Sequence, residues 1–84
     1  MMNAVVTGAS KGIGKAIAEK LAREGWNVAI CARNAAALET ARIAIQQQNP
    51  AVTVLAIQAD MGVKEQVLSF ASQVKTAFPT IEML

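Results

Sequence analysis

The sequence predicts an α/β fold in which a doubly wound parallel sheet is built in the order β-α-β-α-β-α-β. Three observations predict it. Short apolar runs alternate along the chain with stretches of helical periodicity. Each helical stretch is about 10–15 residues long, which suits a right-handed crossover between neighbouring parallel strands. A glycine-rich segment lies at the first junction between a strand and a helix.

The first strand and the first helix are predicted from a change of period. Residues Asn3–Thr7 form a short apolar run rich in β-branched side chains, which is typical of a strand buried on both faces. Apolar side chains then recur every fourth residue at Ile13, Ile17 and Leu21, and charged side chains cover the opposite side. The alanines at positions 16, 18 and 22 complete the apolar side. This pattern predicts an amphipathic helix, and Gly25 is a suitable residue to end it.

The remaining elements continue the alternation of strand and helix. Half of a doubly wound sheet leaves large apolar faces uncovered. We therefore expect the chain to be the N-terminal half of this fold, with the remainder of the domain outside this sequence. Further strands are predicted at residues 26–31, 52–57 and 81–84, and further helices at residues 35–47 and 63–78.

Composition excludes several classes of partner and location. The 84 residues hold 8 Lys and Arg against 6 Asp and Glu, and the basic residues are scattered. No basic run marks a surface for nucleic acid or for a membrane. No apolar window approaches the length of about 18 residues that spans a bilayer, and nothing near Met1 resembles a secretory signal. We expect a cytoplasmic protein that binds neither nucleic acid nor membrane.

The sequence contains few side chains that could act as nucleophiles, metal ligands or acid catalysts. A single Cys excludes an internal disulfide, and a single Cys without any His argues against a metal site. The chain also lacks Tyr, so neither a His-based triad nor a Tyr acid is available. We predict no catalytic residue within this sequence.

A glycine-rich segment, Thr-Gly-Ala-Ser-Lys-Gly-Ile-Gly, occupies residues 7–14. Gly8 permits a sharp exit from the strand, Gly12 lets a pyrophosphate approach the backbone, and Gly14 lets the helix sit close to the sheet. The N–H groups of Gly12, Ile13 and Gly14 open a helix, where the dipole favours an anion. A Rossmann-type dinucleotide site is predicted; a tight turn without a ligand is the alternative.

The residues after the second predicted strand indicate the choice of cofactor. NAD-binding folds place an acidic residue about 20 residues past the glycines, where it binds the ribose 2′-hydroxyl. This chain has Cys-Ala-Arg-Asn at residues 31–34, so a cation replaces the carboxylate. Arg33 can form paired hydrogen bonds with a 2′-phosphate and stack on adenine. Lys11 could add charge there and Ser10 could add a hydrogen bond. The alternatives are solvated loop side chains for Arg33 and Lys11 and a turn-stabilising hydroxyl for Ser10.

These residues resemble the short-chain dehydrogenase/reductase family along the entire chain, and more narrowly its bacterial ketoreductases and sepiapterin-reductase-like members. Basic residues at Lys11 and Arg33 then imply NADP as the cofactor. The resemblance assigns the adenine amino group to the Asp60 carboxylate, with Met61 beside it through a backbone contact. A helix N-cap is the alternative role for Asp60. Residues 1–84 would be the N-terminal part of a single dinucleotide-binding domain.

The resemblance also implies an activity. Family members transfer hydride between the cofactor and a ketone, aldehyde or alcohol, and the intact protein is expected to be a homodimer or homotetramer. The family's catalytic Asn, Ser, Tyr and Lys have no counterparts in this chain. We expect the NADP(H)-binding half of such an oxidoreductase, and a truncated, non-catalytic NADP(H)-binding module is the alternative. The spacing of Gly8, Gly12 and Gly14 disfavours the extended family, which carries Gly-x-x-Gly-x-x-Gly.

Overall fold

The computed structural model describes residues 2–9 and 12–81, and this part of the chain folds in the order β-α-β-α-β-α. The α/β class and the parallel sheet are confirmed. The fourth strand predicted at residues 81–84 falls, apart from Ile81, outside the described residues. The elements are β1 (Asn3–Thr7), α1 (Gly12–Arg23), β2 (Asn27–Ala32), α2 (Ala35–Gln48), β3 (Val54–Gln58) and α3 (Lys64–Ala77).

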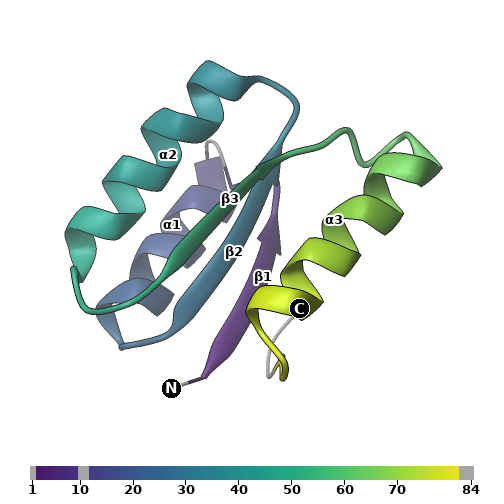
Figure 1. The fold of residues 1–84 in the computed structure, drawn as a ribbon. Coiled ribbons are helices and arrows are strands. Elements are labelled where there is room, and N and C mark those ends of the chain that lie inside the picture. Colours follow the sequence, from purple (N-terminus) through teal and green to yellow (C-terminus); the bar gives the residue numbers. More distant parts are fainter. Residues whose placement is uncertain (1, 10–11, 82–84) are drawn as a thin grey trace.

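The sheet is the middle of three layers. Its described strands lie in the order β1-β2-β3, and both pairs are parallel, with Val5 aligned to Ala29 and Ala29 to Leu55. Helices α1 and α2 cover one face and α3 covers the other (Figure 1). Each crossover therefore returns the chain to the same end of the sheet, and the carboxyl ends of all three strands share one edge.

Each face of the sheet has its own apolar core. Side chains on successive strand residues point to opposite faces, so β2 contributes Val28 and Ile30 to one core and Ala29 and Cys31 to the other. Helices α1 and α2 close the first core with alanines and with the larger Leu21, Leu38 and Ile45. Helix α3 closes the second core with Phe70, Val74 and, just after the helix, Phe78.

The buried face of α1 matches the predicted one in part. Of the side chains expected on the apolar side, the helix buries Ala18, Leu21 and Ala22. Ile13 and Ile17 were expected to face the core with them, but they are 80% and 45% exposed. Small alanine side chains let the helix backbone approach the sheet closely, and this orientation leaves the two isoleucines on the outer side. None of the helices in the described residues is long and apolar enough to cross a membrane.

A chain of polar contacts joins the amino ends of the strands. The Asn27 amide nitrogen donates to Asn3 Oδ1 at 3.0 Å, and Asn27 Oδ1 accepts from the backbone N–H of Thr53 at 2.8 Å. The Asn3 amide donates in turn to the Thr80 carbonyl at 2.8 Å. These bonds tie together the beginnings of β1, β2 and β3 and the segment after α3. This edge of the sheet is fixed by hydrogen bonds, and the opposite edge carries the hollow described below.

We expect residues 1–84, expressed alone, to unfold without a sharp cooperative transition. Among the described residues β1 pairs on one side only, and Ile13, Ile17 and Leu68 are exposed. Burial in so small a chain barely offsets a backbone entropy cost of about 1–2 kcal/mol per residue. Urea unfolding followed by far-UV circular dichroism should be broad, with a small m-value. A sharp two-state transition with m of about 1 kcal/mol/M or more would contradict this expectation.

Candidate functional site

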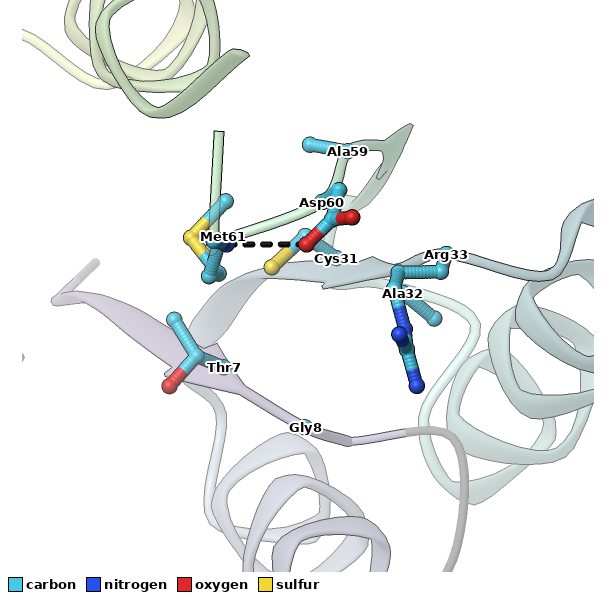
Figure 2. A pocket seen from close by; sticks show the side chains of 9 residues that line it. Thr7, Gly8, Cys31, Ala32, Arg33, Ala59, Asp60 and Met61 are labelled. Atoms are coloured by element: carbon cyan, nitrogen blue, oxygen red, sulfur yellow. Dashed lines mark hydrogen bonds between the residues drawn. The ribbon is translucent and has the colours of Figure 1, made fainter. Parts of the chain in front are cut away.

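A hollow of about 380 Å³ opens at the carboxyl ends of the strands (Figure 2). In open α/β sheets, ligands bind outside these ends, and the volume falls in the range of small-molecule sites. Backbone and side chains from the ends of β1, β2 and β3 surround it. Its lining consists of Thr7, Gly8, Cys31, Ala32, Arg33, Ala59, Asp60, Met61 and Gly62.

The turn between β1 and α1 depends on glycine. Gly8 and Gly12 have φ values of +68° and +67°, a region that side chains with a Cβ rarely adopt. At Gly14 the constraint is space, because an added Cβ would lie 2.6 Å from the carbonyl oxygen of Gly8. The first turn of α1 therefore packs directly on the end of β1, in agreement with the close approach expected at Gly14.

The start of α1 brings first-turn backbone N–H groups to this edge. Gly12, Ile13 and Gly14 form the first turn of the helix, where N–H groups have no partner within the helix itself. The Ile13 side chain is exposed, so an approaching ligand meets an apolar surface beside these amides. Ser10 and Lys11, which the sequence places against a phosphate or ribose, lie outside the described residues.

Arg33 lies in the turn between β2 and α2. Asn34 is the N-cap of α2, and its side chain accepts from the N–H of Ala37 at 2.9 Å. The amide of Gln58, the last residue of β3, donates to the Arg33 carbonyl at 2.9 Å. The guanidinium is exposed and makes no hydrogen bond or ion pair within residues 2–9 and 12–81. Figure 2 shows it extending across the hollow's rim on the side of Gly8.

Asp60 is not the N-cap of α3, so the alternative role considered for it is wrong. Val63 occupies the cap position and makes no side-chain capping bond. The Asp60 carboxylate instead accepts from the N–H of Gly62 at 2.8 Å, which closes a tight turn (Figure 2). Gln66 on α3 accepts from the Asp60 N–H at 2.6 Å. This turn holds Asp60 and the partly exposed Met61 at the wall of the hollow.

Cys31 contributes the floor of the hollow rather than a reactive group. Its side chain is 1% exposed, and burial raises the pKa of the thiol. A thiol held protonated at neutral pH is a poor nucleophile, so the expected reading of Cys31 as a small apolar side chain fits the structure. In the part of the chain that the structure describes, no group of three or more His, Cys, Asp or Glu side chains could hold a metal ion.

Two residues at this edge were missed by sequence reasoning. Gln58 and Gln66 hold the backbone of Arg33 and Asp60 from neighbouring elements. In the sequence Gln58 is only a polar residue at the end of an apolar run, and Gln66 is one of several polar residues on the outer face of a helix. Their partners lie 25 and 6 residues away, so no local pattern identifies them.

The site brings together the expected residues that the structure describes. Gly8, Arg33, Asp60 and Met61 line one hollow, and the start of α1, with Gly12, Ile13 and Gly14, packs on the end of β1 through Gly14. Three strand ends, one helix N-terminus and a guanidinium that is unpaired within the described residues can accommodate an extended ligand with several negative charges.

Comparisons with known proteins agree with this arrangement. A family model described as short chain dehydrogenase matches residues 2–84. The 3-oxoacyl-(acyl-carrier-protein) reductase of Staphylococcus aureus is 36% identical over 83 residues, which is 98% of this chain and 33% of that protein. An alcohol dehydrogenase from the archaeon Thermococcus sibiricus, complexed with 5-hydroxy-NADP, is 38% identical with a TM-score of 0.87, covering 96% of this chain and 34% of that one.

A second solved structure shows a different cofactor. NAD+-bound xylitol dehydrogenase is 30% identical with a TM-score of 0.90, over 98% of this chain and 31% of that one. Similar structures therefore contain either nucleotide. The chain spans about a third of the length of the curated relatives that it matches. The family match along the chain, the glycine turn and the sheet topology together show that this chain belongs to the short-chain dehydrogenase/reductase family.

Proposed function

We propose that residues 1–84 form the NADP(H)-binding part of a short-chain oxidoreductase that transfers hydride between NADPH and a ketone, aldehyde or alcohol. The observation that carries this proposal is the contact between Gly14 and the Gly8 carbonyl, where a Cβ has no room. It brings a helix N-terminus to the edge of the sheet beside a hollow of suitable size. The remainder of the proposed enzyme lies outside this sequence.

The residues of this edge fit the cofactor in three places. The first-turn amides of α1 would hold the pyrophosphate, because free N–H groups and the helix dipole favour an anion. Asp60 would accept a hydrogen bond from the adenine amino group, with the Met61 backbone beside it. NADPH, when bound, supplies hydride from C4 of its nicotinamide. The described residues bind and orient the cofactor, and the groups that would move a proton to the substrate lie elsewhere.

The preference for NADP over NAD rests on Arg33. No carboxylate stands within residues 31–34 to accept the 2′-hydroxyl of NAD. The Arg33 guanidinium is exposed, at the rim of the hollow, and unpaired within the described residues. A guanidinium matches the geometry of a phosphate with two parallel hydrogen bonds. Lys11 and Ser10 are proposed to assist at the same phosphate.

The proposal extends to the complete enzyme. Its substrate is a small carbonyl compound or alcohol, as the family implies, and we propose a homodimer or homotetramer in the cytoplasm. A non-catalytic NADP(H)-binding module is the second candidate, and the absence of Tyr and His from residues 1–84 fits both candidates. The sequence that follows Leu84 in the gene separates the two, because the enzyme requires a Tyr and a Lys four residues after it.

We expect a purified chain of residues 1–84 to have no carbonyl reductase activity. The sequence contains no Tyr or His to protonate a carbonyl oxygen. NADPH oxidation with a broad panel of ketones and aldehydes, followed by absorbance, should equal the buffer blank. A rate above the blank that depends on both protein and ketone would contradict the assignment of catalysis to residues outside this chain.

Arg33→Leu in the complete enzyme should weaken the binding of NADPH and leave the binding of NADH nearly unchanged. Loss of a charge-assisted hydrogen-bonded pair costs about 1.5–3 kcal/mol, so the ratio of kcat/KM for NADPH over NADH should fall by about tenfold to a hundredfold. Ala32→Asp combined with Arg33→Ser should lower the ratio further, since the new carboxylate accepts the 2′-hydroxyl and repels a phosphate. Steady-state kinetics with both cofactors measures the ratio.

The matched control is Arg23→Leu, which removes an exposed cation from the other end of α1. It should leave the cofactor ratio unchanged. Raising the ionic strength should weaken the binding of NADPH more than that of NADH, because only NADPH carries the extra phosphate. A ratio that stays within about twofold of wild type in Arg33→Leu would mean that Arg33 is a solvated residue and that the NADP assignment is wrong.

Gly14→Ala should weaken the binding of NADPH and of NADH by similar factors. The added Cβ meets the Gly8 carbonyl at 2.6 Å, so α1 must move away from the strand end. Overpacking of this kind costs about 1–3 kcal/mol, which predicts a loss of affinity of about tenfold for each cofactor and a lower thermal midpoint. Fluorescence titration with both nucleotides measures it. Ala16→Ser, at an exposed position of α1, is the control, and equal affinities in the two variants would contradict the close-approach role.

A further inference from the structure

The two peptide groups that flank the Arg33 Cα are both held by the end of β3. The carbonyl before it, that of Ala32, accepts from the N–H of Ala59 at 3.0 Å. The carbonyl after it, that of Arg33 itself, accepts from the side-chain amide of Gln58 at 2.9 Å. Both distances are typical of well-formed N–H···O bonds. With both peptides fixed, the direction of the Arg33 Cα–Cβ bond is fixed as well.

Gln58 is placed for this contact by the register of the sheet. It is the last residue of β3 and is aligned with Ala32, the last residue of β2. Its side chain therefore reaches one residue beyond the paired strands, to the first carbonyl of the turn. On the other side of Arg33, the Asn34 side chain caps α2 through the N–H of Ala37. The turn that carries Arg33 is thus anchored from β3 and from α2.

The Arg33 side chain itself has no anchor among the described residues. Its guanidinium is exposed, and the starting direction given by the backbone decides which region it samples. A guanidinium binds a phosphate strongly only where its two donors meet two oxygens in a common plane. If the backbone of this turn could adopt other conformations, the guanidinium would spend less time in the position where it forms two hydrogen bonds with a phosphate.

We propose that Gln58 is a positioning residue for Arg33, and that it sets the preference for a 2′-phosphorylated dinucleotide through its bond to the Arg33 carbonyl. The proposal deepens the function proposed above and rests on it. Gln58 need not touch the cofactor. Its contribution is to hold the turn in one conformation, so that less side-chain and backbone freedom is lost when the phosphate binds.

The test is Gln58→Met in the complete enzyme. Met has a similar length and no donor, so it removes the bond to the Arg33 carbonyl without adding charge. We expect KM for NADPH to rise about threefold to tenfold, because one net hydrogen bond is lost. We expect KM for NADH to change by less than about twofold and kcat to be unchanged with both cofactors. Unaltered circular dichroism and thermal midpoint would show that the sheet is intact.

Three further variants make the result decisive. Gln73→Met removes a comparable exposed bond, from the Gln73 amide to Ser69 Oγ on α3, and should leave both KM values unchanged. Gln58→Met added to Arg33→Leu should have no further effect on NADPH, since the two residues act through one contact. Gln58→Glu, which places an acceptor opposite the carbonyl, should lower the NADPH preference at least as much and serves if the Met variant folds poorly.

Each failure points to a different error. A rise of KM for NADPH and NADH by equal factors would show that Gln58 supports only the sheet, and would overturn the proposal. An unchanged cofactor ratio in both Gln58 variants, with the ratio lowered by Arg33→Leu, would overturn the positioning role and leave the proposed function standing. An unchanged ratio in Arg33→Leu would overturn the cofactor assignment and this inference with it.

Discussion

The contact between Gly14 and the Gly8 carbonyl is the constraint on which the site depends. A Cβ at Gly14 would approach that oxygen to 2.6 Å, so only glycine lets the first turn of α1 rest on the end of β1. The positive φ values of Gly8 and Gly12 complete the sharp reversal between the two elements. The helix N-terminus consequently meets the sheet at an edge where three strands end, and first-turn amides of a helix are suited to an anion there.

The amino ends of the strands are joined by hydrogen bonds that stabilise the sheet, and the carboxyl ends form the candidate binding site. At the amino ends, hydrogen bonds through Asn3 and Asn27 connect three strands and the segment after α3. At the carboxyl ends, side chains are short or exposed, and a hollow remains. Polar side chains there bond to the backbone of the lining turns, as Gln58 and Gln66 do. These bonds fix the backbone of the turns around the hollow. The Arg33 guanidinium has no partner within the described part of the chain.

Much of the fold could be predicted from the sequence because its signals are local. Short apolar runs, helical periodicity and the glycine turn depend on neighbouring residues, and the described strands and helices lie close to their expected positions. On α1, Ala18, Leu21 and Ala22 are buried as expected, but the burial predicted for Ile13 and Ile17 was wrong, because periodicity does not show how closely the helix packs on the sheet. The bond from Gln58 to the Arg33 carbonyl joins residues 25 apart and depends on the register between β2 and β3, which no single stretch of sequence encodes.

The most direct measurement is a crystal structure of the complete protein with NADPH. The account predicts pyrophosphate oxygens within about 2.7–3.2 Å of first-turn amides of α1, a 2′-phosphate paired with the Arg33 guanidinium, and the adenine amino group at Asp60. It also predicts that the Gln58 amide still bonds to the Arg33 carbonyl. A pyrophosphate bound away from the start of α1, or a 2′-phosphate directed into solvent with Arg33 unpaired, would contradict it.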